Sequence, residues 1–328
     1  MNTFEELSLS AAASIPNPAG LEWVRHIQTI ASPPLTIILR IITNLVSEYV
    51  FLIVLMVLYW LWNERRAFWL GLTTILAVWL NETAKNAFKM PRPFHLDSSL
   101  GMIHENGYGF PSGHAQLSLT LLVVLAAWFA EGAFSKKEKP PSSKKIIVWI
   151  CTVVLVLLVA FSRLYLGVHF PWDIAGGWLL GGLVLVLFFL FPRIFAILPK
   201  PTGKIFLAAA GLTAFCMNAV YPHNSTSGAL FFGFSAGYIV MQRFFPFTAY
   251  FNSETQTYSR IKPAVVFFTG FMGLVLFYLL LKALFPGPDS SFYQLFRFIR
   301  YALVGFWASG GAPWLFKKLP FTNTTEPL

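Results

Sequence analysis

The stretch "GFPSGHAQLSLTLLVVLAAWFA", residues 109–130, joins a turn containing Pro and Gly to an almost uninterrupted apolar run. The run is close to the roughly 20 residues that a helix needs to cross the hydrocarbon core of a bilayer. A histidine, His114, stands where this helix would begin. The stretch therefore predicts a membrane-spanning helix whose first turn carries an ionisable side chain.

The whole chain has the composition of a polytopic membrane protein. Its 328 residues are 56% hydrophobic and 12% charged, and apolar runs of spanning length recur along most of it. We predict an all-α transmembrane bundle of about nine spans. They are expected near residues 35–62, 68–88, 111–130, 146–165, 172–191, 205–221, 229–245, 265–285 and 294–316.

The sequence divides softly into two regions. Residues 21–30, "LEWVRHIQTI", place apolar side chains near one helix face, which is typical of a short helix lying in the membrane interface. The link "PKPTG" at residues 199–203 follows the fifth span, and its Pro and Gly residues favour a connection. We expect a core over residues 21–191, made of the interfacial helix and five spans, and an additional four-span region over residues 204–316.

Lys and Arg fall unevenly on the two sides of the predicted bundle. Alternate loops on one side carry 15 of the 24 basic residues, namely Arg65, Arg66, Lys136, Lys137, Lys139, Lys144, Lys145, Arg193, Lys200, Lys204, Arg243, Arg260, Lys262, Lys317 and Lys318. The positive-inside rule makes that side cytoplasmic and places the start of the third span outside. Topology thus accounts for the net charge of +10, and no nucleic-acid partner is expected.

Cys151 and Cys216 lie in apolar stretches and are expected to pack inside helices, without a disulfide or a thiolate metal site.

Three cations are predicted on the outer face. Lys85 and Arg92 lie in "KNAFKMPRP", residues 85–93, and Arg163 lies in "SRLYLGVHFPWD", residues 162–173. Guanidinium groups match phosphate oxygens bidentately, while a lysine acts as a point charge. Three cations on one membrane face predict a phosphate site.

The "PSGH" segment supplies a second anion-binding feature. Pro111 is suited to the first turn of the third span, where its missing N–H costs nothing. The amides of Ser112 and Gly113 would then be free at a helix N-terminus, where the helix dipole favours an anion. The segment also brings His114, a candidate proton donor, to the same place.

A second histidine has a carboxylate at helical spacing. His169 and Asp173 are four residues apart at the start of the fifth span, so the carboxylate is expected to reach one ring nitrogen. Such a bond fixes the tautomer and leaves the other ring nitrogen as a nucleophile.

In these residues the chain resembles the type-2 phosphatidic acid phosphatase superfamily, also called the lipid phosphate phosphatases. The motifs of that family run KxxxxxxRP, PSGH and SRxxxxxHxxxD, and all three are intact and in order within residues 22–191. The resemblance implies that His169 is the nucleophile that forms a phosphohistidine, that Asp173 orients it, and that His114 acts as acid and then as base. The phosphate-binding residues that it implies are Lys85, Arg92, Ser112, Gly113 and Arg163.

The resemblance also implies an activity. It predicts metal-independent hydrolysis of a lipid phosphate monoester or pyrophosphate, without a cofactor, by an enzyme of a plasma membrane or a bacterial inner membrane. From the Lys and Arg distribution, the site is expected to face the extracytoplasmic side. Phosphatidate, phosphatidylglycerol phosphate, undecaprenyl pyrophosphate and sphingoid phosphates all remain open as substrates, and so does the oligomeric state. The alternatives are a phosphotransferase that passes the phosphohistidine to an acceptor lipid, and a non-enzymatic transporter or scaffold for lipid phosphates.

Two features lie outside the family motifs. The four extra C-terminal spans give a layout similar to that of sphingosine-1-phosphate phosphatases and certain bacterial relatives. Carboxylates within spans are costly and usually paired or functional. Glu82 lies three residues before Lys85 and is expected to support it by pairing on one helix face, whereas Glu48 has no expected partner. His104 and Glu105 are expected near a lipid head group.

Overall fold

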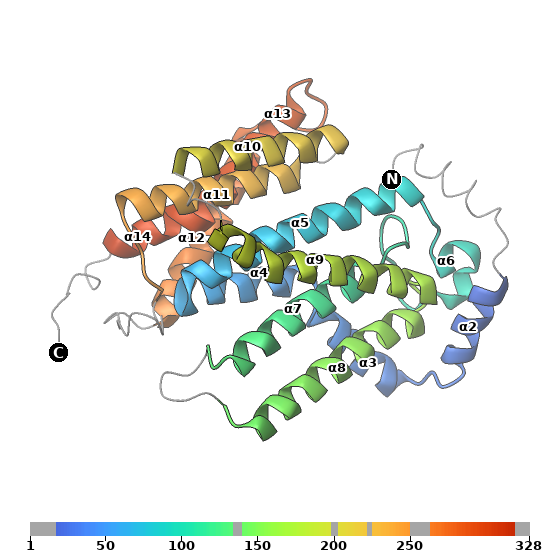
Figure 1. Ribbon diagram of the computed structural model, residues 1–328. Helices are drawn as coiled ribbons and strands as arrows, with labels where there is room; N and C mark the ends of the chain where they lie inside the picture. The colour runs from blue at the N-terminus through green and yellow to red at the C-terminus, as the bar shows by residue number, and fades with distance from the viewer. Residues whose placement is uncertain (1–17, 134–139, 198–202, 222–224, 250–262, 319–328) are drawn as a thin grey trace. The chain divides into compact units, whose positions relative to one another are not determined.

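The computed structural model describes residues 18–133, 140–197, 203–221, 225–249 and 263–318 (Figure 1). Every regular element in this part of the chain is a helix, which confirms the all-α class. The helices are α2 (Pro18–Gln28), α3 (Pro33–Asn44), α4 (Glu48–Val57), η1 (Leu58–Trp62), α5 (Glu64–Phe88), α6 (Pro93–Leu96), η2 (Ser98–Leu100), α7 (Gly113–Ala130), α8 (Ser142–Tyr165), α9 (Pro171–Ile197), α10 (Gly203–Val220), α11 (Thr226–Phe244), α12 (Pro263–Leu284), α13 (Tyr293–Phe306), η3 (Trp307–Gly311) and α14 (Ala312–Lys318). Most of the predicted link at residues 199–203 lies outside the described residues.

Among the described residues, five helices are long and apolar enough to cross a membrane. They are α7, α8, α9 up to Leu190, α10 and α12. A sixth span results if α3 and the α4–η1 segment, which meet at 47°, count as one. The predicted number of nine is not confirmed. In α5, charged residues at its start and near its end shorten the apolar stretch, and α13 is only 14 residues long before a π-helix interrupts it.

The first predicted span, residues 35–62, is broken rather than continuous. α3 ends at Asn44, and α4 begins at Glu48. The hydroxyl of Ser47 accepts a hydrogen bond from the Val50 N–H (3.4 Å), as an N-cap serine does at a helix start. A serine inside the apolar run therefore allows a new helix to begin, and the run changes direction there.

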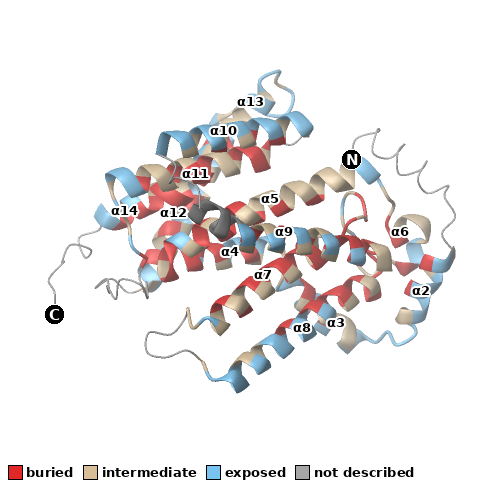
Figure 2. Cartoon of the chain, in the orientation of Figure 1, coloured by how far each residue is buried: buried red, intermediate tan, exposed pale blue. Residues whose placement is uncertain are grey.

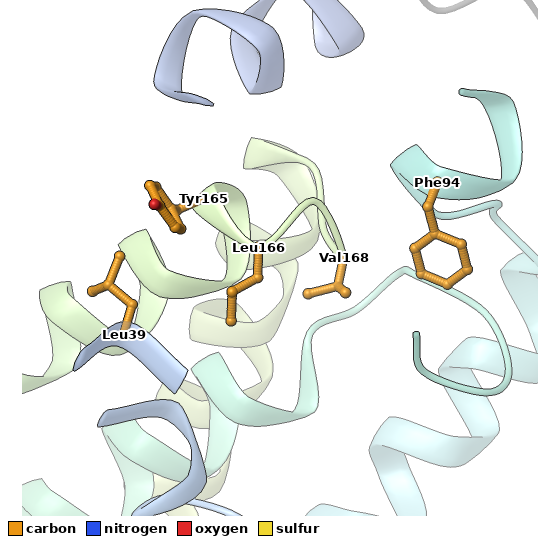
Figure 3. Close-up of a cluster of buried hydrophobic side chains, with 5 residues drawn as sticks. All are labelled: Leu39, Phe94, Tyr165, Leu166 and Val168. Atoms are coloured by element: carbon orange, nitrogen blue, oxygen red, sulfur yellow. The ribbon is translucent and has the colours of Figure 1, made fainter. Parts of the chain in front are cut away.

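One compact unit contains the described parts of Met1–Phe51 and Leu80–Phe189. Its buried apolar cluster joins α3, α6, the end of α8 and the chain that follows it, and Figure 3 shows its side chains: Leu39, Phe94, Tyr165, Leu166 and Val168. The predicted interfacial helix is α2, whose Gln28 Nε2 donates to the carbonyls of Leu100 and Tyr165, both at 2.9 Å. These contacts join α2 to η2 and to the end of α8.

The other compact unit contains Leu52–Trp79 and the described part of Leu190–Leu328. Within it, the π-helices η1 and η3 meet: Tyr59 Oη donates to the Ser309 carbonyl (2.8 Å), and Trp60 Nε1 donates to the Ala308 carbonyl (2.9 Å). Residues 52–79 thus group with the C-terminal helices. The division suggested by the sequence near residues 199–203 stays a prediction.

Exposed apolar side chains cover one side of several helices, as the pale blue segments of α8 show in Figure 2. Both cysteines are free and exposed, Cys151 on α8 beside Ile150 and Cys216 on α10 beside Phe215. The expectation that they pack inside the fold is therefore wrong. An apolar stretch does not reveal which helix face meets other helices, and small apolar side chains such as Cys suit a lipid-facing surface equally well.

Candidate active site

The compact unit of residues 18–51 and 80–189 contains all eight predicted site residues. The elements that carry them end or begin at the same region: Lys85 in the last turn of α5, Arg92 at the start of α6, Ser112, Gly113 and His114 at the start of α7, Arg163 in the last turn of α8, His169 before α9 and Asp173 in the first turn of α9.

His169 is bonded to Asp173 as predicted. Nδ1 of His169 lies 3.2 Å from Oδ2 of Asp173, and the same oxygen accepts the Phe170 N–H at 2.8 Å. Because α9 begins at Pro171, His169 precedes the helix instead of lying on its face. With Nδ1 as the donor to the carboxylate, Nε2 carries the lone pair. Arg92 Nη1 lies 3.3 Å from that Nε2.

The surroundings of His169 favour its neutral form. Burial lowers the pKa of His169 well below its usual value, and the nearby charges of Arg92, Arg163 and Lys85 lower it further. A neutral imidazole has a free lone pair for attack on an electrophile. The site therefore presents a ring nitrogen that is oriented and unprotonated at neutral pH.

Arg92 is fixed mainly by backbone carbonyls. Its Nε donates to Gly107 (2.9 Å), its Nη1 to Val168 (3.0 Å) and its Nη2 to Asn106 (3.2 Å). Its own N–H lies 3.2 Å from Nδ1 of His95, so the backbone at the start of α6 is held as well. The guanidinium thereby ties the loop before α7 to the chain beside His169.

Sequence reasoning placed Glu105 only near a lipid head group, but its carboxylate bridges two of the predicted phosphate-binding arginines. Oε2 accepts from Arg92 Nη1 at 3.1 Å, and Oε1 pairs with Arg163 Nη2. Although burial raises the pKa of Glu105, the charges of Arg163 and Arg92 outweigh it and lower the pKa to about 2. No sequence signal fixes this contact, because Glu105 lies in an irregular loop at no regular spacing from either arginine.

Arg163 retains unused hydrogen-bonding capacity. Its Nη1 donates to Thr43 Oγ1 (2.9 Å), which connects it to α3. Its Nε is buried and has no hydrogen-bond partner in the described part of the chain. A buried donor without an acceptor is costly, so this N–H is suited to donate to an oxygen atom of a ligand.

The start of α7 differs in detail from the prediction. The helix begins at Gly113, so Pro111 precedes the N-cap residue Ser112 and does not lie in the first turn. The Ser112 amide is not free, since it donates to the backbone carbonyl of Asp173 at 2.9 Å. Its hydroxyl accepts from the Ala115 N–H at 3.4 Å. These bonds join the start of α7 to the start of α9, and Gly113 remains the first helical amide for an anion.

Asn81, which the sequence analysis did not single out, supports this turn from α5. Its Nδ2 donates to Gln116 Oε1 at 2.8 Å and lies 3.4 Å from the carbonyl of Pro111. The signal was present in the sequence, because an amide side chain inside an apolar helix usually has a specific partner. Only the structure shows which residue that partner is.

Lys85 and His114 complete the group. Lys85 Nζ donates to the Tyr108 carbonyl (2.9 Å). Glu82 and Lys85 form no ion pair, so the expected pairing on one face of α5 is not made, because the ammonium turns to the loop instead. His114 is partly buried in the first turn of α7 and interacts electrostatically with Glu105 and His169.

The other carboxylate singled out within a span, Glu48, is exposed at the break between α3 and α4. It interacts electrostatically with Glu82, Lys85 and Glu105. Within the described ranges, no three or more His, Cys, Asp or Glu side chains are grouped so as to hold a metal ion.

Comparisons with known proteins agree with the motifs. A family model described as the PAP2 superfamily matches residues 66–196, and one described as a PAP2 superfamily phosphatase, transmembrane extension, matches residues 225–324. The chain is 37% identical over 130 residues to phosphatidylglycerophosphatase B of Bacillus subtilis. This alignment covers 38% of this chain and 58% of that protein. It is 30% identical over 118 residues to the undecaprenyl-diphosphatase of Sulfolobus acidocaldarius, over 34% and 48% of the two chains.

The chain thus spans about half the length of the curated relatives that it matches. A crystal structure of a PAP2 type phosphatidylglycerolphosphate phosphatase from Bacillus subtilis aligns with a TM-score of 0.46 and 26% identity, over 60% of this chain and 96% of that chain. The two family matches together cover most of the chain and confirm the predicted membership. The protein is therefore an integral membrane member of the PAP2 superfamily that carries the transmembrane extension of that superfamily.

Proposed function

We propose that this protein hydrolyses a lipid phosphate monoester or diphosphate through a phosphohistidine on His169. The observation that carries the proposal is the placement of its ring, with Nδ1 at 3.2 Å from Asp173 and Nε2 at 3.3 Å from Arg92. Nδ1 is held by a carboxylate, and Nε2 has a lone pair and lies beside a cation that attracts phosphate oxygens.

The first step forms a bond between Nε2 of His169 and phosphorus and breaks the bond to the leaving oxygen. Asp173 accepts the hydrogen bond from Nδ1–H and stabilises the positive charge that develops on the ring. His114 protonates the leaving oxygen. In the second step His114 takes a proton from water, whose oxygen attacks phosphorus and releases inorganic phosphate and neutral His169.

The remaining predicted site residues, apart from Ser112, have binding roles. Lys85, Arg92 and Arg163 neutralise the phosphoryl oxygens, and the Gly113 amide at the start of α7 donates to one of them. The Ser112 amide donates to the backbone carbonyl of Asp173 and is not free for an anion. Ser112 therefore has a structural role, because this bond positions the start of α7 against the start of α9.

The relatives support the proposed substrate class. Two of them are a phosphatidylglycerophosphatase and an undecaprenyl-diphosphatase, which supports a phosphate or diphosphate on a lipid carrier as the substrate here. The test is phosphate release by purified protein in detergent from a panel of such lipids with EDTA present. Release should survive EDTA, disappear in His169→Ala and persist in His26→Ala, which changes an exposed histidine of α2.

Two results would contradict the proposal. No release from any lipid by the wild-type protein would remove hydrolysis, and transfer of phosphate onto a second lipid would identify a phosphotransferase. Equal release by wild type and His169→Ala would show that another group is the nucleophile.

The site is proposed to face the extracytoplasmic side, on the basis of the Lys and Arg distribution. A cysteine-free variant, Cys151→Ser with Cys216→Ser, allows single cysteines to be tested with a thiol reagent that does not cross membranes. In intact cells His104→Cys, beside the site, should react, and Ser143→Cys, at the start of α8, should react only after permeabilisation. The reverse pattern would place the site in the cytoplasm.

A further inference from the structure

We propose that Glu105 is an internal substitute for the substrate phosphate. Its carboxylate occupies Arg92 and Arg163 until a phosphoryl group displaces it. The inference rests on the proposed function, because it takes Arg92 and Arg163 to be the groups that receive the phosphate. A carboxylate offers two oxygens to guanidinium forks, as a phosphate does. The bridge from Oε2 to Arg92 and from Oε1 to Arg163 uses both oxygens.

The position of the carboxylate matches that of the reacting group. Arg92 Nη1 lies 3.1 Å from Glu105 Oε2 and 3.3 Å from His169 Nε2. An anion that replaced the carboxylate at this nitrogen would therefore lie beside the proposed nucleophile. The bridge accordingly occupies the place that a phosphoryl group needs before it can be attacked.

The arginines are fixed, whereas Glu105 is able to leave. The side chains of Arg92 and Arg163 are 4% and 1% exposed, and that of Glu105 is 26% exposed. Backbone carbonyls hold Arg92, and Thr43 holds Arg163. Neither set of bonds involves the carboxylate, so both guanidinium groups keep their positions when it rotates away.

Charge explains why a substitute is present. Two desolvated guanidinium groups without a counter-ion are strongly unfavourable. Glu105 supplies the negative charge when no substrate is bound. The pKa of its carboxyl is about 2, so the side chain stays ionised at neutral pH. The carboxylate therefore competes with an incoming phosphate for the two arginines.

The test compares the binding of inorganic phosphate to wild type and Glu105→Gln. The variant keeps the shape of the side chain and removes its charge. It should bind phosphate about tenfold more tightly or better, the order expected when one charge-assisted competitor is lost. Binding is measured from the dependence of the thermal unfolding midpoint on phosphate concentration. Asp97→Asn is the matched control, since Asp97 pairs with Arg25 at the surface, and it should bind phosphate as wild type does.

Unchanged or weaker phosphate binding by Glu105→Gln would overturn the inference, since the carboxylate would then help to position the arginines. If this variant does not fold, Glu105→Asp serves instead, because it keeps the charge but is too short to bridge both arginines. It should also bind phosphate more tightly than wild type, and equal or weaker binding would again overturn the inference. A wild-type protein that binds phosphate but hydrolyses no lipid phosphate would remove the proposed function, while the comparison of affinities still decides the role of Glu105.

Discussion

Asp173 joins two parts of the site: its carboxylate oxygen Oδ2 lies 3.2 Å from Nδ1 of His169, and its backbone carbonyl accepts the Ser112 amide at 2.9 Å. The side chain thus orients the proposed nucleophile, while the backbone fixes the start of α7. A substitution of the side chain should therefore affect catalysis and leave the helix contact intact.

Asp173→Asn should lower kcat for phosphate release by about a thousandfold or more, because an amide no longer stabilises the positive ring and permits the wrong tautomer. KM should change little, since Asp173 does not contact the phosphate. Steady-state kinetics in detergent measure both, and the thermal midpoint checks the fold. A kcat within tenfold of wild type would show that Asp173 is not needed to orient His169.

Gly167→Ala should destabilise the loop before His169. Gly167 has φ of 72°, and a Cβ at this position would collide with the Leu100 carbonyl. The left-handed conformation alone costs roughly 1–2 kcal/mol for other residues, so the loss of unfolding free energy should exceed about 2 kcal/mol. Activity should fall as well, since His169 is two residues away.

The control for this substitution is Gly182→Ala in α9, where an added Cβ meets no atom within 4 Å. Alanine is the better helix former by about 1 kcal/mol, so Gly182→Ala should be neutral or slightly stabilising. Denaturant unfolding of the two variants in the same detergent makes the comparison. Equal stability of Gly167→Ala and wild type would mean that the loop adopts another conformation.

The contact between His169 and Asp173 could be predicted from the sequence because it depends on local spacing. His169 and Asp173 are four residues apart, and this interval brings them together whichever way the surrounding helices pack. Glu105 and Asn81 could not be assigned in this way. Their partners are distant in sequence and are brought to them by an irregular loop and by packing between helices.

The limits of the fold prediction have the same cause. Hydropathy identifies an apolar run but does not show where a helix breaks inside it, and the run at residues 35–62 breaks where Ser47 caps a new helix. Hydropathy also does not show which face of a helix is buried. For that reason Cys151 and Cys216 were expected inside the fold, although both are exposed.

Asn81 and Gln116 should behave as a coupled pair. Asn81→Ala removes the 2.8 Å donor to Gln116 Oε1 and should cost about 1–3 kcal/mol of unfolding free energy. A double-mutant cycle with Gln116→Ala should give a coupling energy of about 0.5–3 kcal/mol. Thr74→Ala, two turns earlier on α5, is the control partner and should add to Asn81→Ala within about 0.5 kcal/mol. Additivity of Asn81→Ala and Gln116→Ala would show that their contact does not stabilise the turn.

The contribution of His169 to the stability of the protein should fall in mild acid. Its pKa is well below the usual value in the folded protein and near 6.5 in the unfolded chain. Below about pH 6.5 the unfolded state therefore binds a proton that the folded state does not. The unfolding free energy then decreases with falling pH, by up to about 1.4 kcal/mol per unit for this group.

The measurement is the unfolding free energy between pH 7.5 and pH 5.5. His169→Asn should lose less stability over this range than wild type, whereas His26→Asn makes the same substitution on the exposed face of α2 and should follow wild type. An identical decline in wild type and His169→Asn would show that His169 takes up its proton equally well in the folded protein.

The role of His114 as acid predicts a dependence on the leaving group. His114→Ala should lower kcat about 100- to 10,000-fold for a lipid phosphate monoester, whose alkoxide leaves poorly without a proton. For p-nitrophenyl phosphate, whose leaving group needs no proton, the same variant should slow the first step much less. The comparison requires single-turnover phosphate release, because the second step also uses His114. Equal losses on both substrates would assign His114 to phosphate binding and leave the acid unidentified.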